Sequence, residues 1–91
     1  MKSLNNIVLT TIKDIFTVSS PINRRINVNN RFSYGLSFCE SGKITYSHNN
    51  HSYVSDPTHA IILPKGQSYT LYGDETGFFP LINFNCTNFH T

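Results

Sequence analysis

The stretch from Ala60 to Tyr72, AIILPKGQSYTLY, constrains the fold more than any other part of the sequence. It opens with a short apolar run containing two β-branched isoleucines, a composition that favours a covered strand. Pro64 ends this run because proline has no N–H to donate to a neighbouring strand. Gly66 follows, and glycine adopts the positive φ that a tight turn needs. The stretch therefore predicts two strands, at 60–63 and 68–72, joined by a turn in which Pro64 and Gly66 are structural.

Short alternating runs separated by turns continue along the rest of the chain. The clearest alternation lies at 31–40, where one face carries the large apolar residues Phe32, Tyr34, Leu36 and Phe38. Gly42 lies in a predicted turn at 40–43, and Asn49-Asn50 predicts another because asparagine tolerates positive φ. The predicted strands cover 12–18, 23–28, 31–40, 44–48, 52–55, 60–63, 68–72 and 78–86, with a turn at 73–77. About eight strands joined by closely spaced turns predict an all-β sandwich or small barrel.

The composition bounds the class of protein. The chain of 91 residues suits one small domain, 1–91, in which we expect an N-terminal arm at 1–20 and a β-barrel at 23–86. A formal net charge of +2 is too small to indicate nucleic-acid binding. Cys39 and Cys86 lie in predicted strands without the spacing of a disulfide framework, which favours a reducing compartment. Neither a signal peptide nor a membrane helix is predicted. We expect a cytoplasmic protein without a membrane partner.

Several runs of the sequence occur in a familiar order. They are YGLSF at 34–38 leading into SGK at 41–43, then YV at 53–54, then AIILPKGQSY at 60–69. In this order they resemble a cupin, the double-stranded β-helix of the jelly-roll class, and in particular the N-terminal sensor domain of AraC-type transcriptional regulators. The second cupin motif, G-x5-P-x-G-x2-H-x3-N, aligns with Thr58, Pro64, Gly66, Tyr69 and Gly73. Pro64 and Gly66 match it, whereas Thr58, Tyr69 and Gly73 replace the family's Gly, His and Asn.

The resemblance also bears on metal binding. When the first cupin motif, G-x5-H-x-H-x3–4-E-x6-G, is aligned through Gly42, its acidic position falls at Gly35. Its histidine positions fall at Asn29 and Arg31, or at Val28 and Asn30. Enzymatic cupins hold Fe, Mn, Ni or Zn through three His and one Glu, and none of the aligned positions carries either residue. We therefore predict no metal and no other cofactor, and a protein that is not an enzyme.

The four histidines give no separate metal site. His48 and His51 flank one predicted turn, but two ligands do not make a site. His59 precedes a predicted strand, and His90 lies near the end of the chain. A solvated hairpin tip is the simplest interpretation of His48 and His51.

The resemblance implies a ligand-binding role. It implies an effector-sensing and dimerisation domain that binds a small molecule, such as a sugar, in the barrel. The alternative is a stand-alone small cupin enzyme, similar to a sugar isomerase or epimerase. Ligand-contact positions of the family correspond to Tyr69, Leu71, Phe79 and Leu81, and the interior position Arg31 joins them. Any one of these residues could instead serve only as core.

Which face of the segment 31–40 lies inside the barrel is left open. If the aligned ligand positions point inward, the interior is lined by Arg31, Ser33, Gly35 and Ser37. Burial of apolar surface predicts the reverse, with the aromatic face as core. Both hold if the N-terminal arm or a second subunit covers the aromatic face. We therefore expect a homodimer, with Phe32, Tyr34 or Phe38 contributing if that face is outward.

The resemblance implies that the full-length regulator binds DNA, but this sequence shows no DNA-binding motif. AraC-type regulators bind DNA through C-terminal helix-turn-helix motifs, and no helix is predicted after Phe84. We therefore expect a fragment of a longer regulator, with no nucleic-acid binding by residues 1–91 themselves.

Overall fold

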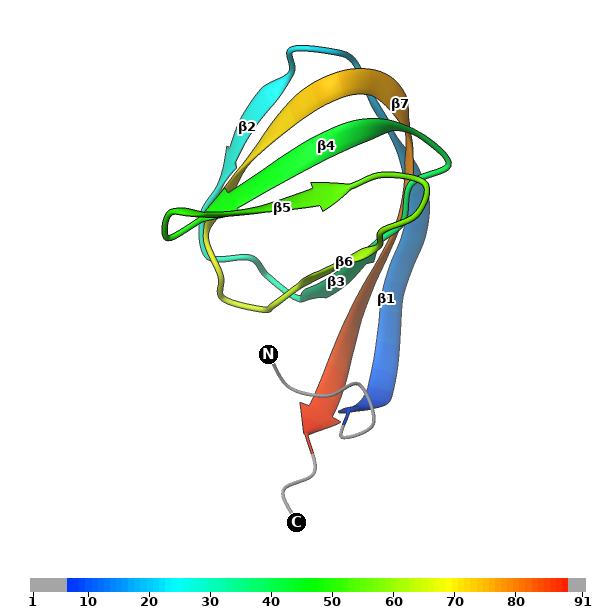
Figure 1. Ribbon diagram of the computed structural model, residues 1–91. Coiled ribbons are helices and arrows are strands. Elements are labelled where there is room, and N and C mark those ends of the chain that lie inside the picture. Colours follow the sequence, from blue (N-terminus) through cyan, green and yellow to red (C-terminus); the bar gives the residue numbers. More distant parts are fainter. Residues whose placement is uncertain (1–6, 89–91) are drawn as a thin grey trace.

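One long strand, β7, organises the sheet in the computed structural model, which describes residues 7–88 (Figure 1). The strands are β1 Ile7–Ser20, β2 Arg25–Val28, β3 Tyr34–Ser37, β4 Ser41–His48, β5 His51–Ser55, β6 Ile61–Leu63 and β7 Tyr69–Asn88. They form one sheet in the order β5-β4-β7-β3-β6, and β1 and β2 also pair with β7. The sheet curls into an open barrel, so the prediction of an all-β barrel is confirmed. Residues 7–88 contain no helix that could cross a membrane.

The turn predicted at 73–77 is wrong, because β7 runs without a break through these residues. Its first half pairs with β2 and β4, and its second half pairs with β1 and β3. Gly73 meets the β1–β2 connection, where its N–H donates to Arg24 O at 2.8 Å and its carbonyl accepts from Asn23 N at 2.7 Å. The glycines at 73 and 77 therefore allow neighbouring backbone to approach a continuous strand. The described chain has seven strands rather than the eight predicted, because the predicted strands at 68–72 and 78–86 form the single strand β7.

The turn at 64–67 is confirmed, but its two flanking strands do not pair with each other. Gly66 has φ 82°, its N–H donates to Arg31 O at 2.8 Å, and Arg31 N donates to Gln67 O at 3.0 Å. β6 pairs with β3 alone, whereas β7 starts beside β2. The turn thus carries the chain from one edge of the sheet to its centre and holds the segment before β3.

Two further turn predictions have different outcomes. The β4–β5 turn is confirmed, since Asn49 and Asn50 have φ of 48° and 65°. The turn predicted at 40–43 is wrong, because β4 already begins at Ser41 and includes Gly42. Gly42 has φ 88° at a register shift between β4 and β7, where a Cβ would lie 2.7 Å from Thr76 O. Gly42 is therefore structural, at a bulge rather than in a turn.

The hydrophobic core joins opposite sides of the barrel. Its buried cluster consists of Ile44, Tyr46, Leu63 and Phe79. Partly buried residues packed against this cluster are Val18, Cys39, Ile61, Tyr69, Leu71 and Leu81. Both cysteines are free, and burial raises the pKa of the Cys39 thiol. The cluster draws on β4, β6 and β7, so these three strands determine how the sheet closes.

β3 places its small residues inside the barrel, so the expectation from burial is wrong. Arg31, Ser33, Gly35 and Ser37 are buried. Phe32 and Phe38 are 61% and 40% exposed. Gly35 lies opposite Leu63 and Asn83, so its face is the inner one. The large inward residues of β4 and β7 already fill the interior, which leaves little room for aromatic side chains from β3.

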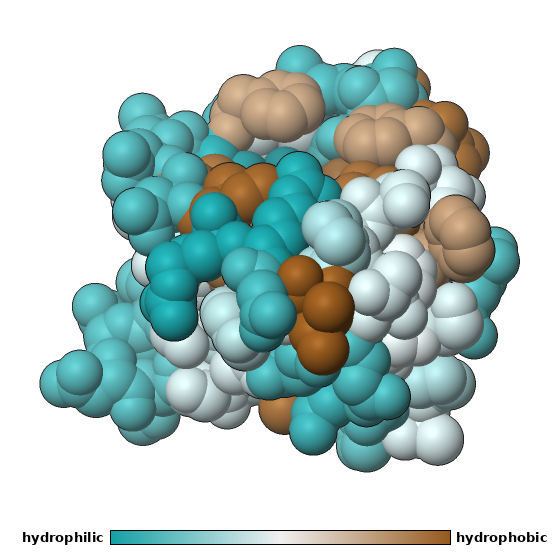
Figure 2. Space-filling view, turned by 90° about the horizontal axis from the view of Figure 1, so that it is seen from above, coloured by the Kyte–Doolittle hydropathy of each residue, from teal (hydrophilic) through white to brown (hydrophobic). Residues whose placement is uncertain are grey.

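The opposite face of this part of the sheet is apolar across four strands. In one row, Ile15 of β1, Ile82 of β7, Leu36 of β3 and Ile62 of β6 lie side by side. We call the following residues the outer face: Ile12, Ile15, Tyr34, Leu36, Phe38, Ile62, Ile82 and Phe84. Tyr34 stacks on Phe84, with ring centroids 5.9 Å apart. The view from above shows a different surface, where hydrophobic residues lie in separate groups among hydrophilic ones (Figure 2).

Replacement of Gly66 by valine should destabilise the protein by about 1–3 kcal/mol. A Cβ at this position meets only Asn30 Oδ1, at 3.8 Å, so the cost arises from the backbone at φ 82° and not from a clash. Urea unfolding of Gly66→Val measures the change, and Gly66→Asn serves as the control because asparagine tolerates positive φ. An unchanged unfolding midpoint for Gly66→Val would show that the turn does not depend on glycine.

Candidate ligand-binding cavities

One cavity lies where the curled sheet meets itself. β5 and β6 are the two ends of the strand order and contact each other without forming a ladder. Between them lies a mainly apolar cavity of about 330 Å³, which we call the seam cavity. Its lining is Tyr46, His48, Tyr53, Ala60, Ile61, Ile62, Leu63, Pro64, Gln67 and Tyr69. A cavity of this size and composition suits a small ligand with an apolar body and few polar groups.

Three tyrosines give the seam cavity its shape. Tyr46 and Tyr53 are cross-strand partners on β4 and β5. Tyr69 meets Tyr46 edge-on, with ring centroids 5.6 Å apart and an interplanar angle of 62°. The Tyr46 hydroxyl lies 3.3 Å from Ser37 Oγ, and burial raises the pKa of Tyr46, so the phenol stays neutral. The cavity therefore offers aromatic faces for stacking and a buried hydroxyl pair for hydrogen bonding.

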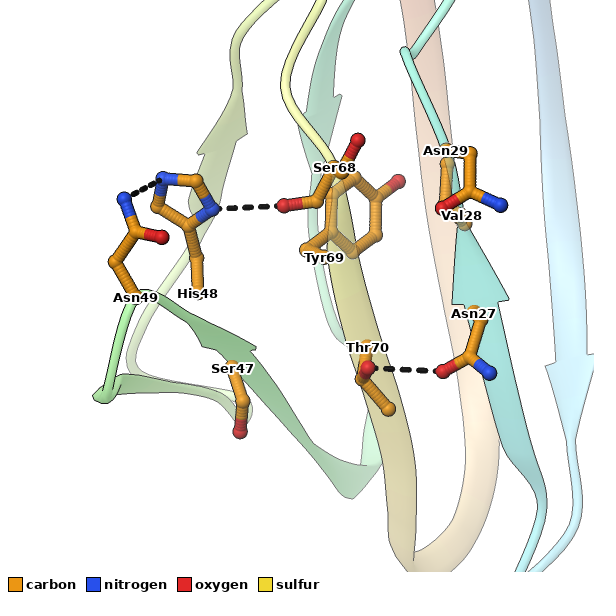
Figure 3. Close-up of a pocket in the computed structure, with 9 residues that line it drawn as sticks. All are labelled: Asn27, Val28, Asn29, Ser47, His48, Asn49, Ser68, Tyr69 and Thr70. Carbon is orange, nitrogen blue, oxygen red and sulfur yellow. Dashed lines mark hydrogen bonds between the residues drawn. The ribbon is translucent and has the colours of Figure 1, made fainter.

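A second cavity, of about 370 Å³, is open and more polar (Figure 3). We call it the polar cavity, and its lining is Asn27, Val28, Asn29, Ser47, His48, Asn49, Ser68, Tyr69 and Thr70. Thr70 Oγ1 donates to Asn27 Oδ1 at 2.9 Å, which joins β7 to β2 across its floor. His48 and Tyr69 line both cavities and form the wall between them.

Hydrogen bonds hold His48 in one orientation (Figure 3). Its Nδ1 lies 2.7 Å from the Ser68 carbonyl oxygen, which can only accept, so Nδ1 carries the proton. Asn49 Nδ2 lies 3.1 Å from His48 Nε2, which accepts in the neutral ring. This network fastens the β4–β5 hairpin to the start of β7.

Arg31 is the most unusual residue of the interior. It is only 6% exposed. Its Nη1 donates to Ser33 O at 3.0 Å, and its Nη2 donates to Asn83 Oδ1 at 2.7 Å. Asn83 in turn donates from Nδ2 to Asp14 Oδ1 at 2.8 Å, so this network reaches β1. Arg31 Nε is buried without a hydrogen-bond partner.

The residues predicted as ligand contacts occupy three kinds of position. Tyr69 lines both cavities. Arg31 is buried in the interior against Gly35 and lines neither of the two cavities described above. Phe79 is 2% exposed in the core cluster, and Leu71 and Leu81 pack against that cluster. None of these last three lines either of the two cavities described above.

Several cavity residues were not predicted as site residues. They include Tyr46, Tyr53, His48 and Gln67. A signal for the first two was present, because Tyr46 and Tyr53 lie at equal distances from the Asn49-Asn50 turn and must pair in a tight hairpin. The closeness of this pair to β6 depends on how the sheet curls, and no local pattern reports it.

The histidines do not assemble a metal site in the part of the chain that the structure describes. No three His, Cys, Asp or Glu side chains gather within residues 7–88. His59 Nδ1 lies 2.9 Å from Asp56 Oδ1, which also accepts from Thr58 N and Oγ1. The hydrogen bond to His59 contributes most, and together these bonds lower the pKa of Asp56 to about 2. They also organise a surface turn. His90 lies outside the described residues.

Comparisons with known proteins identify the fold. No protein-family model and no curated protein sequence matches the chain. A cupin superfamily protein from Desulfitobacterium hafniense DCB-2 has a similar structure, with a TM-score of 0.65 at 9% identity over 86% of this chain and 84% of that one. The Cupin_2 domain of an XRE family transcriptional regulator from Enterobacter cloacae matches with a TM-score of 0.63 at 10% identity, over 86% of this chain and 96% of that one. The chain therefore has the fold of the cupin superfamily.

Proposed function

We propose that this chain is the effector-sensing and dimerisation domain of a bacterial AraC-type transcription regulator, with a sensing rather than a catalytic role. The seam cavity is the observation that carries the proposal. Its lining is mainly aromatic and aliphatic, and it lies between two strand edges that no hydrogen-bonded ladder joins. The Enterobacter cloacae cupin domain, which belongs to a regulator of another family, supports a regulatory context for the fold.

The position of the seam cavity supplies a way to transmit binding. A ligand that contacts Tyr53 on β5 and Leu63 on β6 would favour arrangements in which these edges lie close together. Residues alternate along β6, so Ile61 and Leu63 face inward while Ile62 belongs to the outer face. A shift of β6 on ligand binding would therefore move part of the outer face as well.

A binding screen tests the sensing role. ¹⁵N-labelled protein is titrated with sugars, sugar acids and small aromatic compounds, and we expect a binding member to shift mainly the amides at 53–55 and 61–63. Tyr53→Ala should weaken that ligand about tenfold, because Tyr53 lines the cavity. Tyr72→Ala is the control, because Tyr72 lines neither cavity. Shifts that avoid both edges for every binding compound would contradict the proposal.

The outer face is the proposed dimer interface. It spans four strands, with Ile12 and Ile15 53% and 63% exposed, and such a surface in water favours association. Sedimentation equilibrium should show a mass that rises from monomer towards dimer as the concentration approaches roughly hundreds of micromolar, where weak interfaces associate. A monomer mass throughout this range would exclude the dimer.

A pair of variants assigns the interface. Phe38→Ser removes a 40% exposed aromatic residue from the outer face, and it should weaken association about tenfold with little change in the melting midpoint. Ile22→Ser is the matched control, because Ile22 is 54% exposed in the β1–β2 connection, outside that face. Equal weakening by both variants would place the interface elsewhere.

A further inference from the structure

The interior of the barrel holds a positive charge that no negative charge contacts directly. The Arg31 guanidinium is buried, and its hydrogen-bond acceptors, Ser33 and Asn83, are neutral. Within residues 7–88, the one ion pair with atoms in contact distance joins Asp56 and His59 at the surface. Buried charges are normally paired, because the loss of hydration is compensated by an opposite charge. Arg31 also keeps an unused donor, since its buried Nε has no partner.

Arg31 does not itself line the seam cavity, but its guanidinium packs on Gly35, a neighbour of the lining residues. A Cβ on Gly35 would come within 2.5 Å of Nη2 and 2.8 Å of Cζ. Leu63, the cross-strand partner of Gly35, lines the cavity. Gln67, whose carbonyl accepts from Arg31 N, also lines it. Tyr46 lines the cavity too, and its hydroxyl lies 3.3 Å from Oγ of Ser37, the next inward residue of β3 after Gly35.

We propose that the effector is a small carboxylate, with its ring or apolar body against the tyrosines of the seam cavity and its carboxylate on Arg31. This inference rests on the proposed sensing function and specifies the chemistry of its ligand. A carboxylate would supply the missing charge and accept from Nε–H and a free Nη–H, a paired geometry that guanidinium groups favour. Sugar acids and aromatic acids share this chemistry.

Asp14 does not already fill this role. It reaches Arg31 only through the amide of Asn83, which accepts from the guanidinium and donates to the carboxylate. Asp14 is exposed on β1, where water and salt screen its charge. The bridge orients Arg31 and leaves its Nε side unused.

Two matched pairs of compounds test the proposal. Benzoate is compared with benzamide, and glucuronate with glucose, so that each pair keeps its body and differs in charge. The dissociation constants come from titration of the wild-type protein by heteronuclear NMR. The charged member of at least one pair should bind about tenfold or more tightly than its neutral partner. The pair that binds distinguishes an aromatic acid from a sugar acid.

Variants connect this preference to Arg31. Arg31→Met keeps a long apolar side chain and should remove the preference for the charged compound. Lys65→Gln removes a positive charge from the exposed turn near the cavity and should leave the preference intact. If Arg31→Met fails to fold, the side-chain Nε–H resonance of Arg31 in wild-type protein gives the answer. It should shift with the charged compound and not with its neutral partner.

The outcomes separate the two proposals. Equal binding of charged and neutral compounds, with shifts at the seam strands, would overturn the carboxylate inference and leave the sensing function standing. A charge preference that persists in Arg31→Met would also overturn it. Absence of binding by both charged compounds would overturn it too, and the wider binding screen then decides the sensing function by itself.

Discussion

Replacement of Gly77 by alanine is expected to destabilise the folded state severely. The start of β4 pairs with β7 at this point, next to a register shift, and a Cβ on Gly77 would overlap the Ser41 carbonyl group and lie 2.7 Å from Gly42 Cα. These contacts are backbone atoms, which cannot rotate away as a side chain does. The reverse contact is equally close, since a Cβ on Gly42 would lie 2.8 Å from Gly77 Cα. We expect a loss of about 4 kcal/mol or more, from the roughly 5–14 kcal/mol available to a domain of this size.

The control for Gly77→Ala is another glycine of different geometry. Gly66 has a positive φ but open space around its Cα, so Gly66→Ala should cost only about 1–2 kcal/mol. Urea unfolding and the dispersion of ¹H–¹⁵N spectra compare the two variants. Similar unfolding midpoints would show that β4 and β7 separate easily where Gly77 meets Gly42.

Gly73 and Gly77 together explain the largest error in the predicted strands, the turn at 73–77. Gly73 and Gly77 indicate a turn when the sequence is considered alone, because glycine is the commonest residue of tight turns. In the structure they lie within β7 and admit the β1–β2 connection and the start of β4. A glycine that lets another backbone segment approach closely looks the same in the sequence as a glycine that adopts a positive φ. The two cases differ only in the segment, distant in the sequence, that packs against the glycine.

Features that depend on a few neighbouring residues were predictable. The turns at Gly66 and at Asn49-Asn50 follow from the φ that each residue tolerates, and the structure shows both. The alternation in β3 also follows from local geometry, since successive side chains of a strand point to opposite sides. Periodicity does not say which side is the interior. That choice depends on Tyr46 and Phe79, which lie on other strands and fill the barrel.

The candidate site was predictable only in part for the same reason. The cupin resemblance pointed to Tyr69, which lines both cavities, and to Arg31, which is buried in the interior and lines neither. The seam between β5 and β6 arises from the closing of the whole sheet, and local patterns carry no information about it. Tyr53 therefore lines the cavity because of how the sheet closes, and no sequence motif indicates this position.

Phe79→Ala should have the second largest effect, and it bears on how the interior is divided between core and site. Phe79 is 2% exposed and packs with Ile44, Tyr46 and Leu63. Its removal leaves a cavity among side chains from three strands, so we expect a loss of about 3–5 kcal/mol in the free energy of unfolding. Urea unfolding followed by near-ultraviolet circular dichroism measures the loss and the packing of the tyrosines.

The preceding residue supplies a matched control for Phe79→Ala. Phe78 is 52% exposed and its side chain points to the opposite side of β7, so Phe78→Ala should change the free energy of unfolding by only about 0.5 kcal/mol. If Phe79→Ala proved as mild as Phe78→Ala, Phe79 would not be a core residue, and its predicted role as a ligand contact would regain support. A large loss in the free energy of unfolding for Phe79→Ala alone would mean that Phe79 belongs to the core. The proposed binding site would then be confined to the part of the interior near Tyr69 and Arg31. The ligand would then bind in the seam cavity, which Phe79 does not line.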